Sequence, residues 1–244
     1  LKQFSNMNLT IDQGNSSTKI GFFDKGKLIS THKLVFLDKS SLSELVKKHS
    51  PENAIISSVT NENGIPEDLG LNIPGKILFF DHQTPIPIEN RYKTPETLGK
   101  DRLAAVIGAA ALYPDTPLLV VDAGTAITFD LIHQNIFYGG NISPGLKMRF
   151  DALHQQTKKL PRTNDSISPF WGTSTIEAIR SGVRNSLLME FEGYIKTIKE
   201  QYPNAKIILT GGDADFFVSY TKSVIFAQPN LVLSGLNRII EYNV

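Results

Sequence analysis

The chain has 244 residues, a formal net charge of +1 and 41% hydrophobic residues. This composition is typical of a globular protein with one large domain or two of about 100–130 residues, and the small net charge provides no field to attract nucleic acid or an anionic membrane. The chain has no cysteine, which excludes disulfides and thiolate chemistry and is compatible with the cytoplasm, where we expect the protein. No apolar run approaches the ~20 residues of a membrane span, so we expect no membrane partner.

The N-terminal residue is leucine, which is not a normal start. We therefore expect Met7 to be the initiator and residues 1–6 to be a non-native extension; a processed native N-terminus is the alternative. Alternating and helical hydrophobic spacing then predicts the elements of the first half, with Ser40 or Ser41 as an N-cap. These are strands at 8–12, 18–23, 28–35, 54–59 and 77–80, a hairpin turn at 24–27, and helices at 40–49, 67–71 and 103–113.

The segment 81–97 is expected to be irregular, because its three prolines oppose a regular helix or a central strand. A connection this long often has a function. It leads into Gly99-Lys100-Asp101-Arg102 at the start of an Ala- and Leu-rich helix. A carboxylate at that position is stabilised by the helix dipole, by ~0.3–1 kcal/mol at an exposed site.

The second half repeats the pattern of a three-strand meander followed by helices. Its expected strands are 117–122, 126–131, 136–139, 206–209 and 224–227, and its helices are 146–156, 176–202, 214–220 and 231–242. Between them, 139–145 is predicted to be a glycine-rich bend with Pro144 near the first helical residue. Meanders followed by crossovers predict an α/β fold with mixed sheets flanked by helices. We expect two domains, 7–115 and 116–244.

Two turns have nearly the same sequence, one after each first strand. Asp12-x-Gly14 and Asp122-x-Gly124 both follow an apolar strand and precede a second strand. Glycine at such a bend adopts backbone angles that other residues avoid, and it lets a ligand approach the main chain. Amides and hydroxyls there suit phosphate oxygens, and an aspartate suits a hard cation. We therefore expect a duplicated phosphate-binding unit with a cleft between the halves.

No P-loop and no dinucleotide fingerprint is present. The motifs that are present, in order, are Asp12-x-Gly14-Asn15-Ser16-x-x-Lys19, Gly99-x-Asp101-Arg102, Asp122-x-Gly124-Thr125-Ala126-x-Thr128, Gly139-Gly140-x-Ile142-x-Pro144-Gly145 and Thr210-Gly211-Gly212-Asp213. The paired Asp-x-Gly turns with the late Gly-Gly-Asp resemble the actin-like kinase superfamily. The full ordered set, from Asn8 to the last helix, resembles the type III pantothenate kinases.

The resemblance implies duplicated actin-like (ribonuclease H-like) domains. It also implies ATP-dependent phosphorylation of pantothenate to 4'-phosphopantothenate, the first step of coenzyme A biosynthesis. The family resemblance further implies a homodimer whose pantothenate pocket is completed at the subunit interface. The helices at 146–156 and 176–202 are the expected contact surface.

The resemblance gives the first turn to the phosphates of ATP and, through Asp12 and water, to Mg²⁺. The residues implied to bind ATP are Asp12, Gln13, Gly14, Asn15, Ser16, Ser17, Thr18, Lys19, Thr125, Gly211 and Gly212. Asp122 is implied to bind a monovalent cation, K⁺ or NH₄⁺. Other interpretations stay open: Asp12 as a turn former, Lys19 as a surface strand residue, and Asp213 as a helix cap.

Asp101 is implied to be the general base that accepts the proton of the pantothenate hydroxyl. An ordinary aspartate is ionised at pH 7, and phosphoryl transfer depends mostly on positioning and charge stabilisation, so a modest base suffices. The residues implied to contact pantothenate are Tyr92, Gly99, Lys100, Asp101, Arg102 and Thr175. Lys100 is a departure, because the family commonly has a small or apolar residue there.

The alternatives for these residues are structural: helix capping for Asp101 and Thr175, an ion pair for Arg102, and loop packing for Tyr92. We also expect Trp171 to serve packing. Two other functions are considered. One is a different actin-like kinase for a sugar or a carboxylate, which the Gly-x-Asp-Arg element disfavours. The other is a non-catalytic homologue acting as a transcription accessory factor, which the intact aspartates disfavour.

Overall fold

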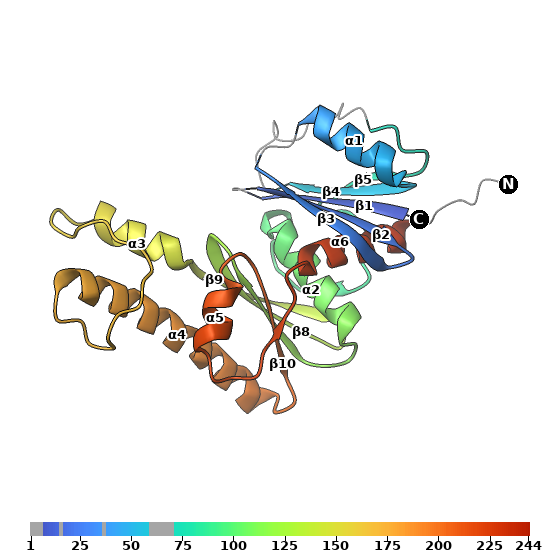
Figure 1. Cartoon of the computed structure of the whole chain (residues 1–244). Helices are drawn as coiled ribbons and strands as arrows, with labels where there is room; N and C mark the ends of the chain where they lie inside the picture. Colours follow the sequence, from blue (N-terminus) through green and yellow to red (C-terminus); the bar gives the residue numbers. More distant parts are fainter. Residues whose placement is uncertain (1–6, 15–16, 36–37, 59–70) are drawn as a thin grey trace. The chain divides into compact units, whose positions relative to one another are not determined.

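The computed structural model describes residues 7–14, 17–35, 38–58 and 71–244 (Figure 1). The chain forms two compact units. Unit 1 comprises Leu1–Asp115, Asn135–Phe137 and Asn230–Val244, and unit 2 comprises Thr116–Gln134 and Tyr138–Pro229. The expected extension 1–6 and most of the helix expected at 67–71 lie outside the described residues. None of the described helices is long and apolar enough to cross a membrane.

Unit 1 is built on a five-stranded mixed sheet. Its elements are β1 (Met7–Gln13), β2 (Thr18–Asp24), β3 (Lys27–Leu34), α1 (Lys39–His49), β4 (Asn53–Ser58), β5 (Ile77–Phe79), β6 (Glu89–Asn90), the 3-10 helix η1 (Pro95–Thr97), α2 (Lys100–Leu112) and α6 (Leu231–Asn243). The strand order is β3-β2-β1-β4-β5, with β1–β2 and β2–β3 antiparallel and β1–β4 and β4–β5 parallel. The meander and the crossover thus give the mixed sheet that the sequence predicts.

Unit 2 repeats this plan. Its elements are β7 (Leu118–Ala123), β8 (Ala126–His133), β9 (Ile136–Pro144) from Tyr138 onward, α3 (Leu146–Gln155), α4 (Thr175–Gln201), β10 (Lys206–Thr210), α5 (Ala214–Tyr220) and β11 (Phe226–Ala227). The strands run in the order β11-β10-β7-β8-β9, with β7–β8 antiparallel and β10 parallel to both β7 and β11. The predicted α/β class with mixed sheets and flanking helices is confirmed.

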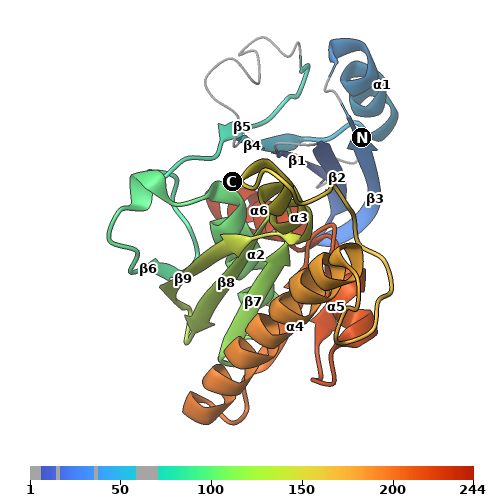
Figure 2. The same cartoon turned by 90° about the vertical axis from the view of Figure 1, so that its left-hand side faces the viewer.

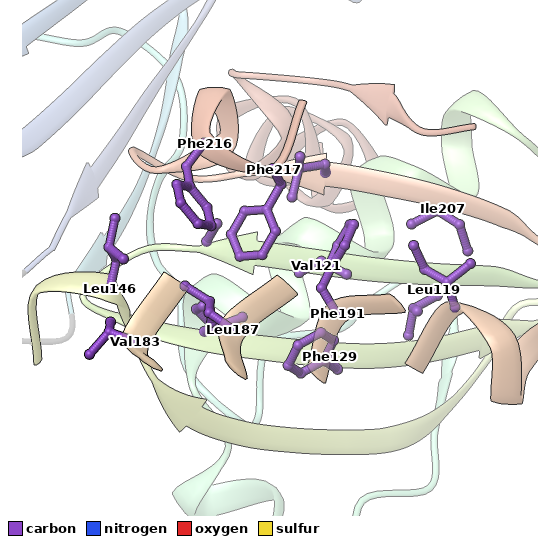
Figure 3. Close-up of a cluster of buried hydrophobic side chains, with 14 of the residues drawn as sticks. Leu119, Val121, Phe129, Leu146, Val183, Leu187, Phe191, Ile207, Phe216 and Phe217 are labelled. Atoms are coloured by element: carbon purple, nitrogen blue, oxygen red, sulfur yellow. The ribbon is translucent and has the colours of Figure 1, made fainter. Parts of the chain in front are cut away.

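The core of unit 2 lies between its sheet and the two helices α4 and α5 (Figures 2 and 3). The apolar positions of β7 and β8 point toward a stripe on α4 that recurs at helical spacing. The stripe consists of Ile179, Val183, Leu187, Phe191, Ile195 and Ile198, and Phe217 of α5 packs on Phe191 with ring centroids 4.6 Å apart. Each such buried side chain contributes about 1.5–3 kcal/mol of transfer free energy.

The last helix belongs to unit 1, whereas the sequence placed it in the second domain. α6 packs on α2 so closely that a Cβ at Gly235 would lie 1.8 Å from the carbonyl oxygen of Ala104. A Cβ at Gly108 would likewise lie 2.5 Å from the carbonyl oxygen of Leu231. The two helices bury their apolar faces in each other, so the chain returns to unit 1 after β11.

The bend predicted at 139–145 is a strand instead. β9 continues to Pro144, and the glycines let it approach β8: a Cβ at Gly140 would lie 2.1 Å from the carbonyl oxygen of Phe129. Pro144 therefore ends the strand, and Gly145 is the N-cap of α3. The sequence pattern marked the glycines correctly but not the sheet contact that requires them.

The N-cap of α1 also differs from the prediction. Asp38, not Ser40 or Ser41, caps the helix, and its Oδ1 accepts hydrogen bonds from Ser40 Oγ at 2.6 Å and from the Ser41 amide at 2.8 Å. These hydrogen bonds hold the pKa of Asp38 well below its ordinary value. An aspartate is as good an N-cap as a serine, so local sequence did not distinguish the candidates.

Candidate active site

The first Asp-x-Gly turn joins β1 to β2 in unit 1. Asp12 is half-buried and lies opposite Lys19 of β2 and Ser57 of β4. The Gly14 amide donates to the Ser17 carbonyl at 3.1 Å, which closes the turn. Asn15 and Ser16, which the resemblance gives to ATP, lie outside the described residues.

Two side chains of this turn are engaged within the fold. Gln13 Oε1 accepts a hydrogen bond from Ser58 Oγ at 2.9 Å, and Thr18 is buried in the sheet. Five of the described residues of the turn are half-buried: Asp12, Gln13, Gly14, Ser17 and Lys19. Gly14 does not have a positive φ, so this turn does not need the backbone conformation that the sequence predicted for its glycine.

The second turn joins β7 to β8 in unit 2. Asp122 is half-buried and Thr125 is exposed, and the Gly124 amide donates to the Ala126 carbonyl at 3.1 Å. Gly124 also lacks a positive φ. A Cβ at Gly124 would lie 3.3 Å from Asp122 Oδ1, so glycine here leaves room beside the carboxylate. The glycine amide closes both turns, but it donates to the third residue along in the first turn and to the second residue along in the second turn.

Two glycine segments pack directly against the second turn. The Gly145 amide donates to the Thr125 carbonyl at 3.1 Å, and a Cβ at Gly145 would lie 2.3 Å from that oxygen. On the β10 side, Gly211 has a φ of +99°, and a Cβ there would lie 2.4 Å from the backbone of Ala123. The structure therefore brings the motifs around Asp122, Pro144 and Gly211 together within unit 2.

Asp213 follows this contact and begins α5. Its amide donates to the Ala123 carbonyl at 2.8 Å, but its side chain makes no capping hydrogen bond. Burial and the nearby charge of Asp165 raise the pKa of Asp213. The sequence left open that Asp213 only caps this helix. Asp213 does occupy the N-cap position, but its side chain does not cap the helix.

Asp101 lies in the first turn of α2, after the N-cap Gly99. Its Oδ1 accepts a hydrogen bond from the Arg102 amide at 2.8 Å, which holds the carboxylate back over the start of the helix. A Cβ at Gly99 would lie 2.6 Å from this same Oδ1. Glycine at position 99 therefore leaves the carboxylate where it is, whereas any other residue would push the carboxylate away. Lys100 is the first residue of the helix and is half-buried.

Arg102 and Tyr92 lie together in unit 1. Arg102 is buried, and its guanidinium carbon lies 5.6 Å from the centroid of the Tyr92 ring. Tyr92 also stacks on Phe137, with ring centroids 6.2 Å apart and an interplanar angle of 10°. The Tyr92 amide donates to Asn90 Oδ1 at 2.9 Å. The proline-rich segment thus places an ordered aromatic ring beside the Gly-x-Asp-Arg element.

Thr175 is exposed at the start of α4 but is not its cap. The N-cap is Ser174, whose Oγ accepts from the Glu177 amide at 3.3 Å. Glu177 in turn accepts from the amide and the hydroxyl of Thr173, each at 2.9 Å, and these hydrogen bonds lower the pKa of Glu177. The capping role that competed for Thr175 is therefore filled by Ser174.

Two arginine contacts of unit 2 were missed by the sequence interpretation. Arg184 of α4 pairs with Asp165, and its guanidinium carbon lies 4.5 Å from the centroid of the Tyr220 ring in α5. Burial alone would lower the pKa of Arg184, but hydrogen bonds to Asp165 and Tyr220 raise it. In the second contact, Arg149 of α3 pairs with Glu190 of α4. Neither arginine belongs to a motif, and only the tertiary contacts distinguish them from surface charges.

The described residues contain no cluster of three His, Asp or Glu side chains able to hold a metal ion. The resemblance implies Mg²⁺, which at a phosphoryl-transfer site is held by one or two carboxylates plus waters and substrate phosphates. Asp12, a half-buried carboxylate near the end of β1, is a suitable donor of that kind.

A cavity of about 520 Å³ lies elsewhere in unit 1. Ile107, Leu112, Asn237, Arg238 and Glu241 are among its lining residues. It adjoins the C-terminal end of α2, and Asp101 is at the other end, roughly 9–16 Å away at 1.5 Å of rise per residue. This cavity is therefore separate from the candidate site.

Comparison with known proteins identifies the family. Residues 8–197 match the family model described as "Type III pantothenate kinase". The chain belongs to the type III pantothenate kinase family. Its similar relatives include the type III pantothenate kinases of Phocaeicola vulgatus, 45% identical over 97% of this chain and 99% of that protein, and of Porphyromonas gingivalis, 44% identical over the same shares.

Solved structures share the fold at lower identity. One is a conserved putative Baf family transcriptional activator from Campylobacter jejuni, with a TM-score of 0.62, 23% identity and coverage of 96% of this chain and 98% of that one. Another is a putative 2-dehydro-3-deoxygalactonokinase from Sinorhizobium meliloti, with a TM-score of 0.59, 13% identity and coverage of 97% and 99%. These likenesses confirm the predicted α/β fold with mixed sheets flanked by helices, and they concern the fold alone.

Proposed function

We propose that this chain transfers the γ-phosphoryl group of ATP to the primary hydroxyl of pantothenate. The hydroxyl oxygen forms the new bond to phosphorus, the bond to the β–γ bridging oxygen breaks, ADP leaves, and the hydroxyl proton passes to a carboxylate. The product is 4'-phosphopantothenate, the first intermediate of coenzyme A biosynthesis. Family membership supports the reaction, and it disfavours both a sugar kinase and a transcription accessory factor.

The observation that carries the mechanism is the position of Asp101. Its carboxylate is fixed at the start of α2 by the Arg102 amide, in space that Gly99 leaves open. A general base must be held within hydrogen-bond reach of the proton that it accepts. We assign this role to Asp101. Arg102 and Tyr92, which contact each other, would bind pantothenate together with Gly99, Lys100 and Thr175.

The two Asp-x-Gly turns would serve the nucleotide and the cations. In the first turn, the described residues Asp12, Ser17 and Lys19 would hold phosphate and Mg²⁺, while Gln13 and Thr18 support the loop. In the second, the exposed Thr125 would contact phosphate and Asp122 would bind K⁺ or NH₄⁺. The Gly211–Gly212 turn, which packs on Ala123, would lie by the nucleotide. Mg²⁺, when bound, neutralises the phosphate charge that develops in transfer.

The proposal includes a homodimer, because unit 2 exposes large apolar side chains around α3 and the start of α4. Trp171 is 80% exposed, although the sequence suggested a packing role for it. Its loop is nonetheless held in place, since Asn185 Nδ2 donates to the Phe170 carbonyl at 3.0 Å. The other exposed apolar residues of this region are Ile142, Met148, Ile167, Phe170 and Ile176. We propose that these side chains form one patch, because a contiguous exposed apolar patch is typical of an interaction site.

An assay of phosphorylation tests the proposal directly. The purified chain is given saturating ATP, Mg²⁺ and K⁺ with pantothenate or with each member of a sugar panel, and ADP release is measured. We expect turnover with pantothenate and with none of the sugars. We also expect the enzyme to be cytoplasmic and to use the cellular ATP pool. Absence of pantothenate turnover, or faster turnover of a sugar, would reject it. Light scattering of wild-type protein and of Trp171→Glu tests the dimer, which the substitution should dissociate.

A further inference from the structure

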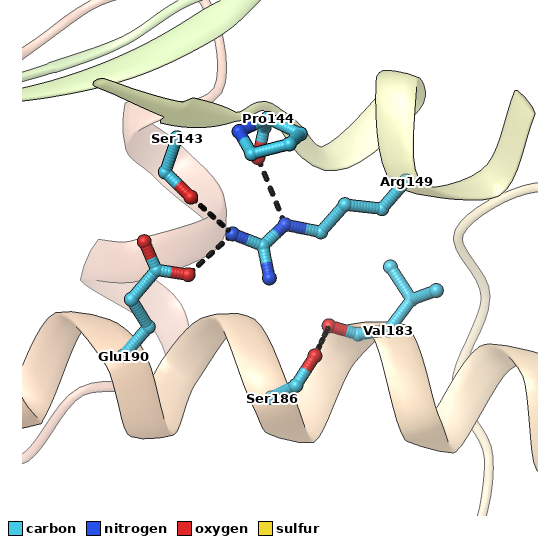
Figure 4. Close-up of polar contacts among 6 residues, drawn as sticks. All are labelled: Ser143, Pro144, Arg149, Val183, Ser186 and Glu190. Atoms are coloured by element: carbon cyan, nitrogen blue, oxygen red, sulfur yellow. Dashed lines mark hydrogen bonds and ion pairs between the residues drawn. The ribbon is translucent and has the colours of Figure 1, made fainter. Parts of the chain in front are cut away.

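Arg149 connects three elements of unit 2 (Figure 4). It lies one turn into α3, and its Nε donates to the Pro144 carbonyl at 2.8 Å. Its Nη2 donates to Ser143 Oγ at 2.8 Å and pairs with Glu190 of α4. The side chains of Arg149 and Glu190 are only 17% and 23% exposed. One guanidinium thus ties the end of β9 and the start of α3 to the middle of α4.

These contacts need an arginine. The acceptors are a carbonyl, a hydroxyl and a carboxylate that lie around one planar group, and a guanidinium offers donors in fixed directions to all of them. A lysine carries the same charge on a single nitrogen and cannot hold this set at once. Because both of its side chains are largely buried, the pair is also less screened by solvent than the pair between Asp151 and the exposed Lys147 on the same helix.

The segment that Arg149 holds is the one that supports the second turn. Pro144 is followed by Gly145, whose amide donates to the Thr125 carbonyl. A Cβ at Gly145 would lie 2.3 Å from the Thr125 oxygen and 2.5 Å from the Gly124 oxygen. The contact between Gly145 and the turn is therefore tight, and a displacement of Pro144 is transmitted to Gly124 and Thr125.

We infer that Arg149 is a positioning residue for the Asp122–Thr125 turn, acting through Pro144 and Gly145, with Glu190 as its counter-ion. The inference rests on the proposed role of that turn in binding phosphate and a monovalent cation. Arg149 sets where the turn lies, and so it sets how well ATP and K⁺ bind. It does not act on the pantothenate hydroxyl.

Steady-state kinetics of Arg149→Gln and Arg149→Lys test the inference, with Lys147→Gln as the matched control on the same helix. Both Arg149 variants are expected to raise the KM for ATP and the half-saturating K⁺ concentration at least fivefold. The KM for pantothenate should stay within twofold. Glu190→Gln still allows the hydrogen bonds of Arg149 to Ser143 and Pro144, so it should raise the same two constants by a smaller factor. The control Lys147→Gln should change none of these constants.

A purely structural role would give a different pattern. The inference is overturned if the KM for ATP and the half-saturating K⁺ concentration of the Arg149 variants stay within twofold of wild type. It is also overturned if their activity falls only in proportion to the folded fraction measured by circular dichroism. Calorimetric titration with Mg–ADP, with and without K⁺, separates it from the assigned reaction. If the wild type turned over no pantothenate, the proposed function would fail. Weaker K⁺-dependent binding of Mg–ADP by Arg149→Gln would still support the inference about Arg149. Unchanged binding of Mg–ADP by this variant would overturn the inference.

Discussion

The carboxylate of Asp101 occupies the space that a side chain at Gly99 would need, since a Cβ at residue 99 would lie 2.6 Å from Asp101 Oδ1. This contact makes Gly99 a direct determinant of where the proposed base points. Because the clashing atom is the end of a flexible side chain, a substitution there moves the carboxylate and leaves the backbone in place.

Gly99→Ala is therefore expected to lower kcat by about tenfold with a modest loss of stability, about 1 kcal/mol for the poorer N-cap. Steady-state kinetics and thermal unfolding measure the two effects. Gly193→Ala is the control, because nothing lies within 4 Å of its added Cβ in α4. It should keep full activity. Full activity of Gly99→Ala would argue against Asp101 as the base.

Asp101→Asn tests the base itself. The asparagine oxygen can still accept from the Arg102 amide, so the helix start should stay intact. We expect kcat to fall by a factor of ~10² or more with near-normal nucleotide binding. Kinetics and calorimetry with Mg–ADP measure these. Asp115→Asn, an exposed position with a φ of +58° that asparagine tolerates, is the matched control. An Asp101→Asn enzyme within twofold of wild type would exclude this assignment.

Activity is expected to require K⁺ or NH₄⁺, because Asp122 is proposed to bind a monovalent cation. Asp122→Asn should raise the half-saturating K⁺ concentration by about tenfold or more, corresponding to ~1.4 kcal/mol of lost cation binding. Initial rates across a K⁺ series, with choline chloride holding ionic strength constant, give the value. Equal activity of wild type with Na⁺ as its only monovalent metal ion would remove the role of Asp122.

The packing of α6 on α2 predicts a large loss of stability for Gly235→Ala. The added Cβ would lie 1.8 Å from a backbone oxygen of Ala104, so the two helices would have to separate. We expect a cost of about 3 kcal/mol, or a fall in Tm of roughly 6–12 °C for a chain of this size. Denaturant titration measures it. Gly193→Ala should instead be neutral or gain about 0.5–1 kcal/mol.

The raised pKa of Asp213 predicts a pH-dependent effect on stability. Burial and the Asp165 charge favour the protonated form in the folded state, so this carboxyl supports folding at acidic pH. That support is lost as pH rises from the ordinary pKa of an aspartate through the higher folded value. Asp213→Asn should therefore be more stable than wild type at pH 7, with a difference that shrinks toward pH 4. Thermal unfolding across this pH range measures it, and a less stable variant at pH 7 contradicts the assignment.

The sequence by itself determined the features that depend on short-range interactions. The paired strands on either side of Asp12 and Asp122 and the bounds of α5 agree with the local hydrophobic spacing. The order of short motifs was enough to indicate the family, since each motif is contiguous in the chain. The same motifs named the candidate residues, whose roles stay predictions.

Only the tertiary structure decided which distant segments pack together. β9 extends to Pro144 because Gly140 lets it pair closely with β8, and α6 joins unit 1 because Gly108 and Gly235 allow two helices to touch. No local sequence pattern predicts the contact of Arg149 with Glu190, because a charged residue is expected at the surface when its partner is unknown. Burial and steric fit are properties of residues far apart in the chain, so no local pattern could have predicted them.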